Sequence, residues 1–116
     1  MKKRILTAAF ILAFALTGVA GAEISNDAKI YYNQGVDNYR NGNFEQAITM
    51  FRQAIAIDSN YIDAYYNLGV ALQQTNNLSD ALNVFKQIIV RNPNDYDAVY
   101  NAALLSMKLG QEDNAK

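Results

Sequence analysis

The sequence predicts an all-α fold, an α-solenoid built from antiparallel pairs of helices, and three observations support this fold class. First, residues 28–61 align without gaps on residues 62–95 with 11 identities in 34 positions, whereas unrelated segments would share roughly two or three. Second, apolar residues recur at intervals of three and four, as on one face of a helix. Third, short polar segments interrupt these apolar patterns and leave room only for turns.

The predicted helices follow this repeat period in order. In each full unit a first helix ends at Asn41-Gly42 or Asn76-Asn77, which are dipeptides that end helices. Residues 58–60 and 92–94 then break the chain between units, and connections this short make neighbouring helices antiparallel. The segment from residue 96 continues the register, so the chain holds about two and a half units. We expect helices near residues 28–41, 44–57, 62–75, 78–91 and 96–109.

The starts of the second helices carry their own signals. Asn43 and Asn77 are residue types that cap helix N-termini well. Gln46 and Asp80 each stand three residues past such a cap, which predicts box-like helix starts.

Small and large residues alternate between the two helices of a unit. Gly35 and Gly69 lie inside first helices, where glycine costs about 1 kcal/mol relative to alanine. A glycine at such a place usually permits the close approach of another backbone. Phe51 and Phe85 stand at equivalent positions of successive units, and we expect them to fill the space between one unit and the next.

The composition excludes several classes of function. The 116 residues include no cysteine and no histidine, which excludes disulfides, thiolate or imidazole metal sites, and catalysis that depends on either side chain. No paired-acid, nucleophile–base or phosphate-loop signal indicates an enzyme or a cofactor. Ten basic and 11 acidic residues give a formal charge of −1, so we expect no nucleic-acid partner.

The segment 1–22 has the order of a secretory signal peptide. Lys2, Lys3 and Arg4 precede an uncharged run, and Ala20-Gly21-Ala22 supplies small residues at an A-x-A cleavage site. We therefore expect cleavage between Ala22 and Glu23, a mature chain of net charge −4, and a periplasmic or secreted location. The alternative is a retained membrane anchor, since the uncharged run is near the lower limit for spanning. The predicted regions are a signal peptide (1–22), a short linker (23–27) and a repeat domain (28–116, with units 28–61, 62–95 and an incomplete 96–116).

The repeat resembles the tetratricopeptide repeat. The period of 34 and the order of an aromatic residue, Leu-Gly, Ala-x-x-x-Phe and Pro are similar to that family. The second unit matches best, with Tyr65, Leu68-Gly69, Ala81, Phe85 and Pro93. The first unit departs at Gln34, Asn38 and Ser59, and the third departs at Val99, Ala102-Ala103 and Ser106. The resemblance covers residues 28–116 and implies a right-handed superhelix whose first helices line a concave groove.

The resemblance implies a peptide-binding groove on this inner face. Asn33, Asn67 and Asn101 recur at the repeat period and form what we term the asparagine ladder. An amide offers donors and acceptors that suit an extended peptide backbone, and tyrosines add rigid surface with a polar tip. The alternative is that these residues only pack helices together. The candidate groove residues are Tyr32, Asn33, Val36, Arg40, Tyr66, Asn67, Val70, Gln74, Tyr100, Asn101, Leu104 and Lys108.

Other residues on the first helices have simpler expected roles. Some family members clamp a C-terminal carboxylate with lysine, arginine and asparagine, but Tyr32 and Val36 occupy two of those places, so we do not expect that clamp. Asp97, like the residue one period before it, suits a helix start through the helix dipole. Met107 and Tyr39 are expected to be packing residues.

The carboxyl end departs from the repeat. Gly110 and Ala115 keep the spacing of Gly42 and Ala47, so a sixth helix is expected to start near Gln111. Glu112, however, stands where the earlier units have an apolar residue. We expect either a fragment of a longer repeat protein or a degenerate cap, with apolar surface left uncovered by Leu104, Leu105 and Leu109.

Two functions remain open at this level. The first is a non-catalytic protein–protein interaction module, a periplasmic scaffold, adaptor or chaperone-like protein that holds an extended or helical partner segment in the groove. The second is a structural or self-assembly segment of a longer protein that associates through its open end. The expected partners are proteins or peptides, with a membrane involved only if the N-terminal segment is retained as an anchor.

Overall fold

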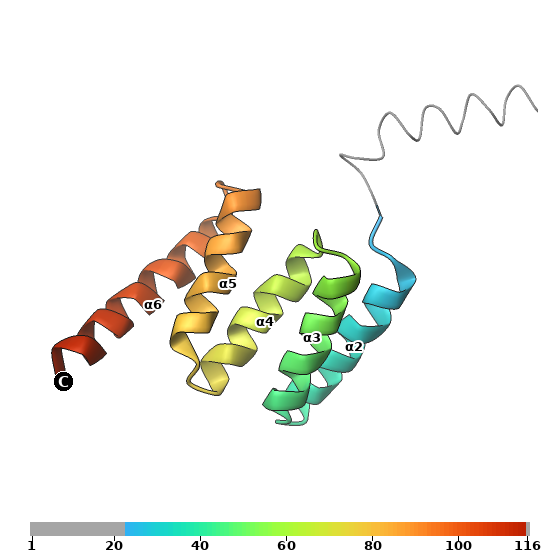
Figure 1. Ribbon diagram of the computed structural model, residues 1–116, viewed down its shortest axis with the longest axis horizontal. Helices are drawn as coiled ribbons and strands as arrows, with labels where there is room; N and C mark the ends of the chain where they lie inside the picture. Colours follow the sequence, from blue (N-terminus) through green and yellow to red (C-terminus); the bar gives the residue numbers. More distant parts are fainter. Residues whose placement is uncertain (1–22, 116) are drawn as a thin grey trace, which may run out of the picture.

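Five α-helices stacked side by side make up the part of the chain that the computed structural model describes, residues 23–115 (Figure 1). No strand occurs in this range. Each helix packs against the next in the chain, and α2 also contacts α4. The predicted all-α solenoid of helix pairs is therefore confirmed. The helices are α2 (Asn26–Arg40), α3 (Phe44–Ile57), α4 (Ile62–Gln74), α5 (Leu78–Arg91) and α6 (Tyr96–Ala115).

Most helix limits lie within two residues of those expected. The first helix begins at Asn26 because Ser25 serves as its N-cap, and the Ser25 hydroxyl accepts a hydrogen bond from the Ala28 amide at 3.4 Å. The predicted signal peptide and its cleavage site after Ala22 lie outside the described residues. Between residues 23 and 115, no helix is long and apolar enough to span a bilayer.

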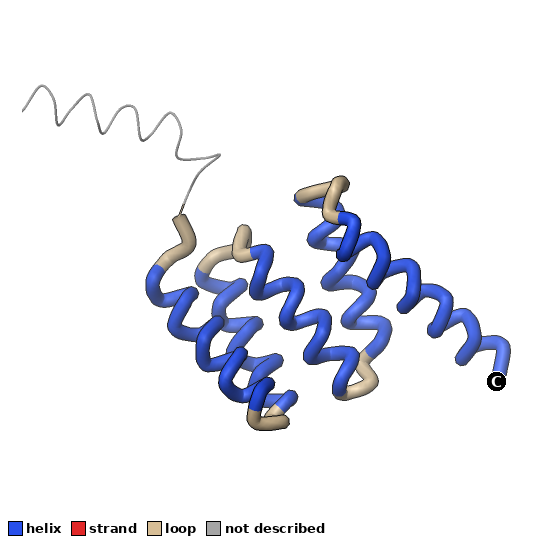
Figure 2. Tube along the Cα trace, turned by 180° about the vertical axis from the view of Figure 1, so that it is seen from behind, coloured by secondary structure: helices blue, strands red, loops and turns tan. Residues whose placement is uncertain are grey.

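The turns inside the two full units, which Figure 2 draws as loops between α2 and α3 and between α4 and α5, share one geometry. Gly42 and Asn76 occupy equivalent positions and adopt positive φ angles of 79° and 60°, a region that glycine and asparagine tolerate best. The next residue then folds back, with the Asn43 amide donating to the Asn38 carbonyl and the Asn77 amide to the Leu72 carbonyl, each at 2.8 Å. The predicted helix-ending role of these dipeptides is confirmed.

The predicted side-chain capping at the second helices is wrong. Asn43 and Asn77 do stand at the N-cap positions, but neither side chain makes a capping hydrogen bond. The Asn77 amide instead donates to the Thr75 hydroxyl at 2.7 Å. Since each tight turn already fixes the backbone of these asparagines, the box-like starts expected from Gln46 and Asp80 are not needed to begin the helices.

The core is organised around two glycine–phenylalanine contacts. A Cβ atom on Gly35 would lie 2.5 Å from Cε1 of Phe51, and one on Gly69 would lie 2.7 Å from Cε2 of Phe85. Both phenylalanines are almost fully buried. The glycines therefore admit an aromatic ring from the second helix of their own unit. The expectation that these glycines admit another backbone is therefore wrong. Phe51 also faces the next unit, as expected, because it lines a pocket together with Asn67 and Val70.

The last helix does not stop where the repeat predicts. α6 runs without a break from Tyr96 to Ala115, so the expected helix end before Gly110 and new helix near Gln111 are wrong. Gly110 has no positive φ angle, and Glu112 gives a following helix no apolar residue with which to pack back. Helix continuation then satisfies the backbone at a cost of about 1 kcal/mol for one glycine.

The uncovered apolar surface of α6 includes Leu104 as expected, but not Leu105 or Leu109. Leu105 is only 3% exposed, and Leu109 is partly buried against the same core. Val99 and Met107 add to the exposed aliphatic surface of Leu104, and Met107 is 63% exposed. Met107 is thus not a packing residue as predicted, whereas Tyr39 is, because its ring meets Phe44 edge-on at 5.1 Å.

Candidate protein-binding groove

The candidate residues lie on α2, α4 and α6, each of which is the first helix of its unit. None of the 12 is buried, so all keep some contact with solvent. The helices are joined through the contact between α2 and α4 and through a hydrogen bond between α4 and α6. We call this shared surface the inner face. Exposed members are Asn33, Arg40, Gln74, Tyr100, Leu104 and Lys108, and half-buried members are Tyr32, Val36, Tyr66, Asn67, Val70 and Asn101.

Two hydrogen bonds connect successive units across the inner face. The side-chain amide of Asn67 donates to the phenolic oxygen of Tyr32 at 2.8 Å. One unit later, the amide of Asn101 donates to the phenolic oxygen of Tyr66 at 3.1 Å. We call these the cross-repeat bonds. They tie the tyrosine of one unit to the asparagine of the next, so the tyrosines and asparagines of the inner face are fixed relative to one another.

The three members of the asparagine ladder are consequently not equivalent. Asn101 also donates to the backbone oxygen of Asp97 at 2.8 Å, which uses the second hydrogen of its amide. Asn67 keeps one amide hydrogen that can donate to a ligand, and its side-chain carbonyl oxygen can accept a hydrogen bond. The exposed side chain of Asn33 makes no hydrogen bond to any other residue between 23 and 115. The sequence could not reveal this difference, because the period alone makes the three positions look identical.

Tyr32 sits in an aromatic group at the start of the inner face. Its ring stacks on Tyr61 with centroids 4.9 Å apart, and it lies 5.9 Å from the ring of Phe51. Burial raises the pKa of Tyr32 above its ordinary value of 10.0, the charge of Asp63 raises it further, and the bond from Asn67 opposes both effects. Burial likewise raises the pKa of Tyr61, with the charges of Tyr32 and nearby acids adding to it. Both side chains therefore stay neutral at physiological pH.

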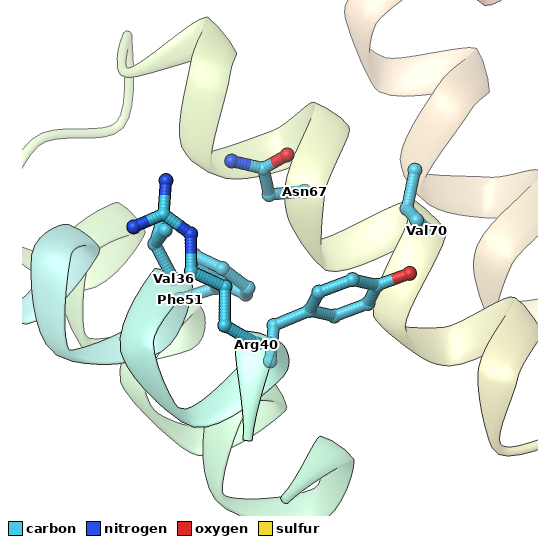
Figure 3. A pocket seen from close by; sticks show the side chains of 6 residues that line it. Val36, Arg40, Phe51, Asn67 and Val70 are labelled. Atoms are coloured by element: carbon cyan, nitrogen blue, oxygen red, sulfur yellow. The ribbon is translucent and has the colours of Figure 1, made fainter. Parts of the chain in front are cut away.

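A pocket of about 250 Å³ opens on the inner face between α2 and α4. Four predicted residues meet there, Val36 and Arg40 from α2 and Asn67 and Val70 from α4 (Figure 3). The lining also includes residues that the prediction missed. Phe51 rises from α3 to form an apolar floor, and Tyr39 adds an aromatic wall next to Arg40. The complete lining of this α2–α4 pocket is Val36, Tyr39, Arg40, Phe51, Asn67 and Val70.

A second hollow of about 220 Å³ lies further along the solenoid. Leu104 and Lys108 line it together with Gln73 and two core leucines. The structure thus brings the predicted residues together in local groups along the inner face and does not gather all 12 into one cavity. No group of three or more acidic side chains able to hold a metal ion occurs among residues 23–115.

Family models match the chain in the same register as the observed helix pairs. A model described as TPR repeat matches residues 37–76, and one described as tetratricopeptide repeat matches residues 62–95. This chain carries tetratricopeptide repeats. Such repeats are in general a non-catalytic fold for protein interaction. No curated protein matches the chain.

Solved structures share the tetratricopeptide-repeat fold. A crystal structure of MamA is 28% identical with a TM-score of 0.69 and covers 76% of this chain and 52% of its own. MamA from Desulfovibrio magneticus RS-1, from residue 41 to its end, is 25% identical with a TM-score of 0.72 and covers 80% and 52%. A chain of the CopN-Scc3 complex is 20% identical in sequence with a TM-score of 0.70, and the match covers 85% of this chain and 58% of that one. The chain spans about half the length of these two MamA chains.

Proposed function

We propose that this chain is a non-catalytic interaction module that holds an extended or helical segment of a partner protein against its inner face. The observation that carries this proposal is the pair of cross-repeat bonds, Asn67 to Tyr32 and Asn101 to Tyr66. They fix polar and aromatic side chains before any partner arrives. A preformed surface of this kind keeps the ordering cost on the receptor small.

The chemistry of the inner face suits a polypeptide ligand. The bonded asparagines keep their side-chain carbonyl oxygens as acceptors for peptide N–H groups, and the bonded tyrosines keep their O–H groups as donors. Exposed Asn33 and Gln74 add amides that are free to turn toward a ligand. Apolar contacts come from Tyr100, which is 64% exposed, and Leu104, which is 45% exposed. A chain of the solved CopN-Scc3 complex has a similar fold.

The setting we propose is the periplasm or the outside of the cell, where the chain would act as a scaffold, an adaptor or a chaperone-like protein. The support is the order of positive, apolar and small residues before Glu23. If the apolar segment is retained, the same module would instead stand on a membrane surface.

A second candidate function is assembly within a longer solenoid or between copies. Val99 and Met107 leave an exposed apolar strip on α6 that no residue between 23 and 115 covers. The chain also spans about half the length of the two MamA chains described above. This reading predicts contacts through α6, whereas the first predicts contacts through the inner face.

The test is affinity capture from a periplasmic extract with residues 23–116, two matched double variants and the single variant Met107→Asp. The inner-face variant carries Asn33→Ala and Gln74→Ala, and the control carries Gln53→Ala and Lys86→Ala on α3 and α5. All four side chains are exposed, so both variants should keep the helical circular dichroism of the parent. We expect the inner-face variant alone to lose its partner. Equal capture by both variants would contradict the proposal, and loss only with Met107→Asp would favour assembly through α6.

A further inference from the structure

The α2–α4 pocket differs from the second hollow, which is lined by leucines and Lys108, in combining an aromatic wall with a guanidinium. Val36, Phe51 and Val70 supply aliphatic and aromatic surface, and Arg40 places a guanidinium at the same pocket (Figure 3). Arg40 is exposed, and no carboxylate among residues 23–115 forms an ion pair with it. A guanidinium beside an apolar surface is weakly hydrated and offers several donors in a fork that matches a carboxylate.

The repeat supplies an internal comparison for this pocket. Moving its lining by one repeat period replaces Tyr39 with Gln73 and Arg40 with Gln74. The equivalent place one unit later therefore lacks the aromatic wall, and its cation is the ammonium of Lys108, not a guanidinium. The combination of an aromatic wall and a guanidinium belongs to the first unit alone, although the backbone of the two units is alike. A general packing need would act on both units, so it does not account for the combination.

The size of the α2–α4 pocket sets the kind of side chain that fits. An apolar cavity of about 150 Å³ is enough for a benzene-sized molecule, and this pocket has about 250 Å³. A leucine, methionine or phenylalanine side chain can enter it, whereas the buried floor at Phe51 would leave a charged group without a partner. The charge of Arg40 then favours an acidic neighbour over a basic one.

We propose that the α2–α4 pocket anchors a large apolar side chain of the partner, with the side-chain carboxylate of an aspartate or glutamate one or two residues away paired to Arg40. This inference rests on the proposed function and adds the chemistry of the partner segment. The cross-repeat bond from Asn67 to Tyr32 holds one wall of the pocket in place. The pocket therefore recognises a large apolar side chain with an acidic residue close by, in addition to any contacts with the peptide backbone.

The test uses three synthetic peptides in a flexible glycine–serine host, which differ only at one dipeptide: Leu-Glu, Leu-Lys or Ala-Glu. Binding to residues 23–116 is followed by NMR through the methyl groups of Val36 and Val70. We expect the Leu-Glu peptide to shift these methyls, with affinity about tenfold above the Ala-Glu peptide and about fivefold above the Leu-Lys peptide. The preference over Leu-Lys should shrink as salt is raised.

Two variants borrowed from the second unit make the test specific. Arg40→Gln and Tyr39→Gln install residues that the chain already uses at Gln74 and Gln73, so folding should persist and is checked by circular dichroism. Arg40→Gln should abolish the preference for Leu-Glu over Leu-Lys and leave the preference over Ala-Glu. Tyr39→Gln should weaken all leucine peptides severalfold.

Three results would overturn the inference. They are equal binding of the Leu-Glu and Leu-Lys peptides, shifts confined to residues outside the pocket, and no shift with about 5 mM peptide, a concentration at which a millimolar Kd is readily detected. The proposed function is judged separately by capture with the Asn33→Ala, Gln74→Ala variant. A partner lost in that variant while the peptides show no preference would keep the interaction module and remove only the acidic-apolar anchor.

Discussion

The side-chain amide of Asn67 donates a hydrogen bond to the phenolic oxygen of Tyr32 over 2.8 Å, from one repeat to the one before it. Asn101 and Tyr66 form the same contact one unit later, at 3.1 Å. Repeat proteins gain stability from interfaces between neighbouring units, and these bonds lie in such interfaces. The asparagines therefore hold units together as well as facing the inner surface, and the two roles can be separated by experiment.

Replacing Asn67 by alanine should destabilise the fold, whereas replacing Asn33 should not. Asn67→Ala removes a partly buried hydrogen bond and should lower the free energy of unfolding by about 1 kcal/mol. Asn33→Ala alters the same repeat position without breaking any bond and should stay within about 0.5 kcal/mol of the parent. Urea titration followed by circular dichroism measures both. Similar losses for the two variants would mean that the cross-repeat bond contributes nothing beyond helix propensity.

A double-mutant cycle isolates the bond itself. Tyr32→Phe keeps the ring that stacks on Tyr61 and removes only the hydroxyl. Combining it with Asn67→Ala should cost less than the sum of the two single changes, with a coupling of about 0.5–1 kcal/mol. Strict additivity would count against an energetic link between these side chains.

Gly35 and Gly110 should respond oppositely to alanine. A Cβ on Gly35 would collide with the Phe51 ring, so Gly35→Ala should cost about 1–3 kcal/mol in unfolding free energy despite its better helix propensity. Gly110 lies inside α6 with nothing within 4 Å of a built Cβ. Gly110→Ala should therefore stabilise the helix by up to about 1 kcal/mol. Thermal unfolding of the two variants compares them, and a stable Gly35→Ala would refute the ring-on-glycine contact.

Alkaline pH should weaken the fold through Tyr32 and Tyr61. Burial and nearby acids raise the pKa of both side chains above the ordinary 10.0, so the folded state binds these protons more tightly than the unfolded state does. The stabilisation is fully present below pH 10 and is lost as the pH rises through the folded-state pKa values. Urea midpoints measured across this range should fall, and Tyr32→Phe should make the fall smaller. A midpoint that rises with pH would reverse the assigned sign.

The leader prediction can be tested on protein secreted by a bacterial host. Removal of residues 1–22 should give a chain whose amino terminus is Glu23, which intact-mass spectrometry identifies directly. The matched control changes the last small residue, Ala22→Gln, and should block processing. Full-length protein in the membrane fraction would instead indicate a retained anchor.

The sequence predicted the features that depend on local pattern. The five helices and the tight turns at Gly42 and Asn76 follow from apolar spacing and from residues that accept positive φ angles. It could not predict the cross-repeat bonds, since a bond between side chains of successive units depends on how the two units meet. The continuous α6 was missed for a related reason. The repeat period placed Gly110 at a position where the first unit ends its first helix. A turn at that position also needs a following helix with apolar residues that pack back against α6.

The candidate site was predicted in part. Periodicity alone placed Val36, Arg40, Asn67 and Val70 on the same surface, and the α2–α4 pocket joins them. Phe51 was expected to fill the space between units but not to line a binding pocket, and it is buried while also forming the pocket floor. Tyr39 was assigned to packing alone. Both omissions arise because a side chain can serve the core on one side and a pocket on the other, and spacing does not report this.

The most direct measurement of the central claim is site-specific photo-crosslinking in cells. A photoreactive amino acid is placed at exposed positions of the inner face, Asn33, Gln74 and Leu104, and at exposed positions of the outer helices, Gln53 and Lys86. We expect one partner protein to be captured from the inner positions and none from the outer ones. Adducts of equal yield from both sets, or from the outer positions alone, would contradict binding at the inner face.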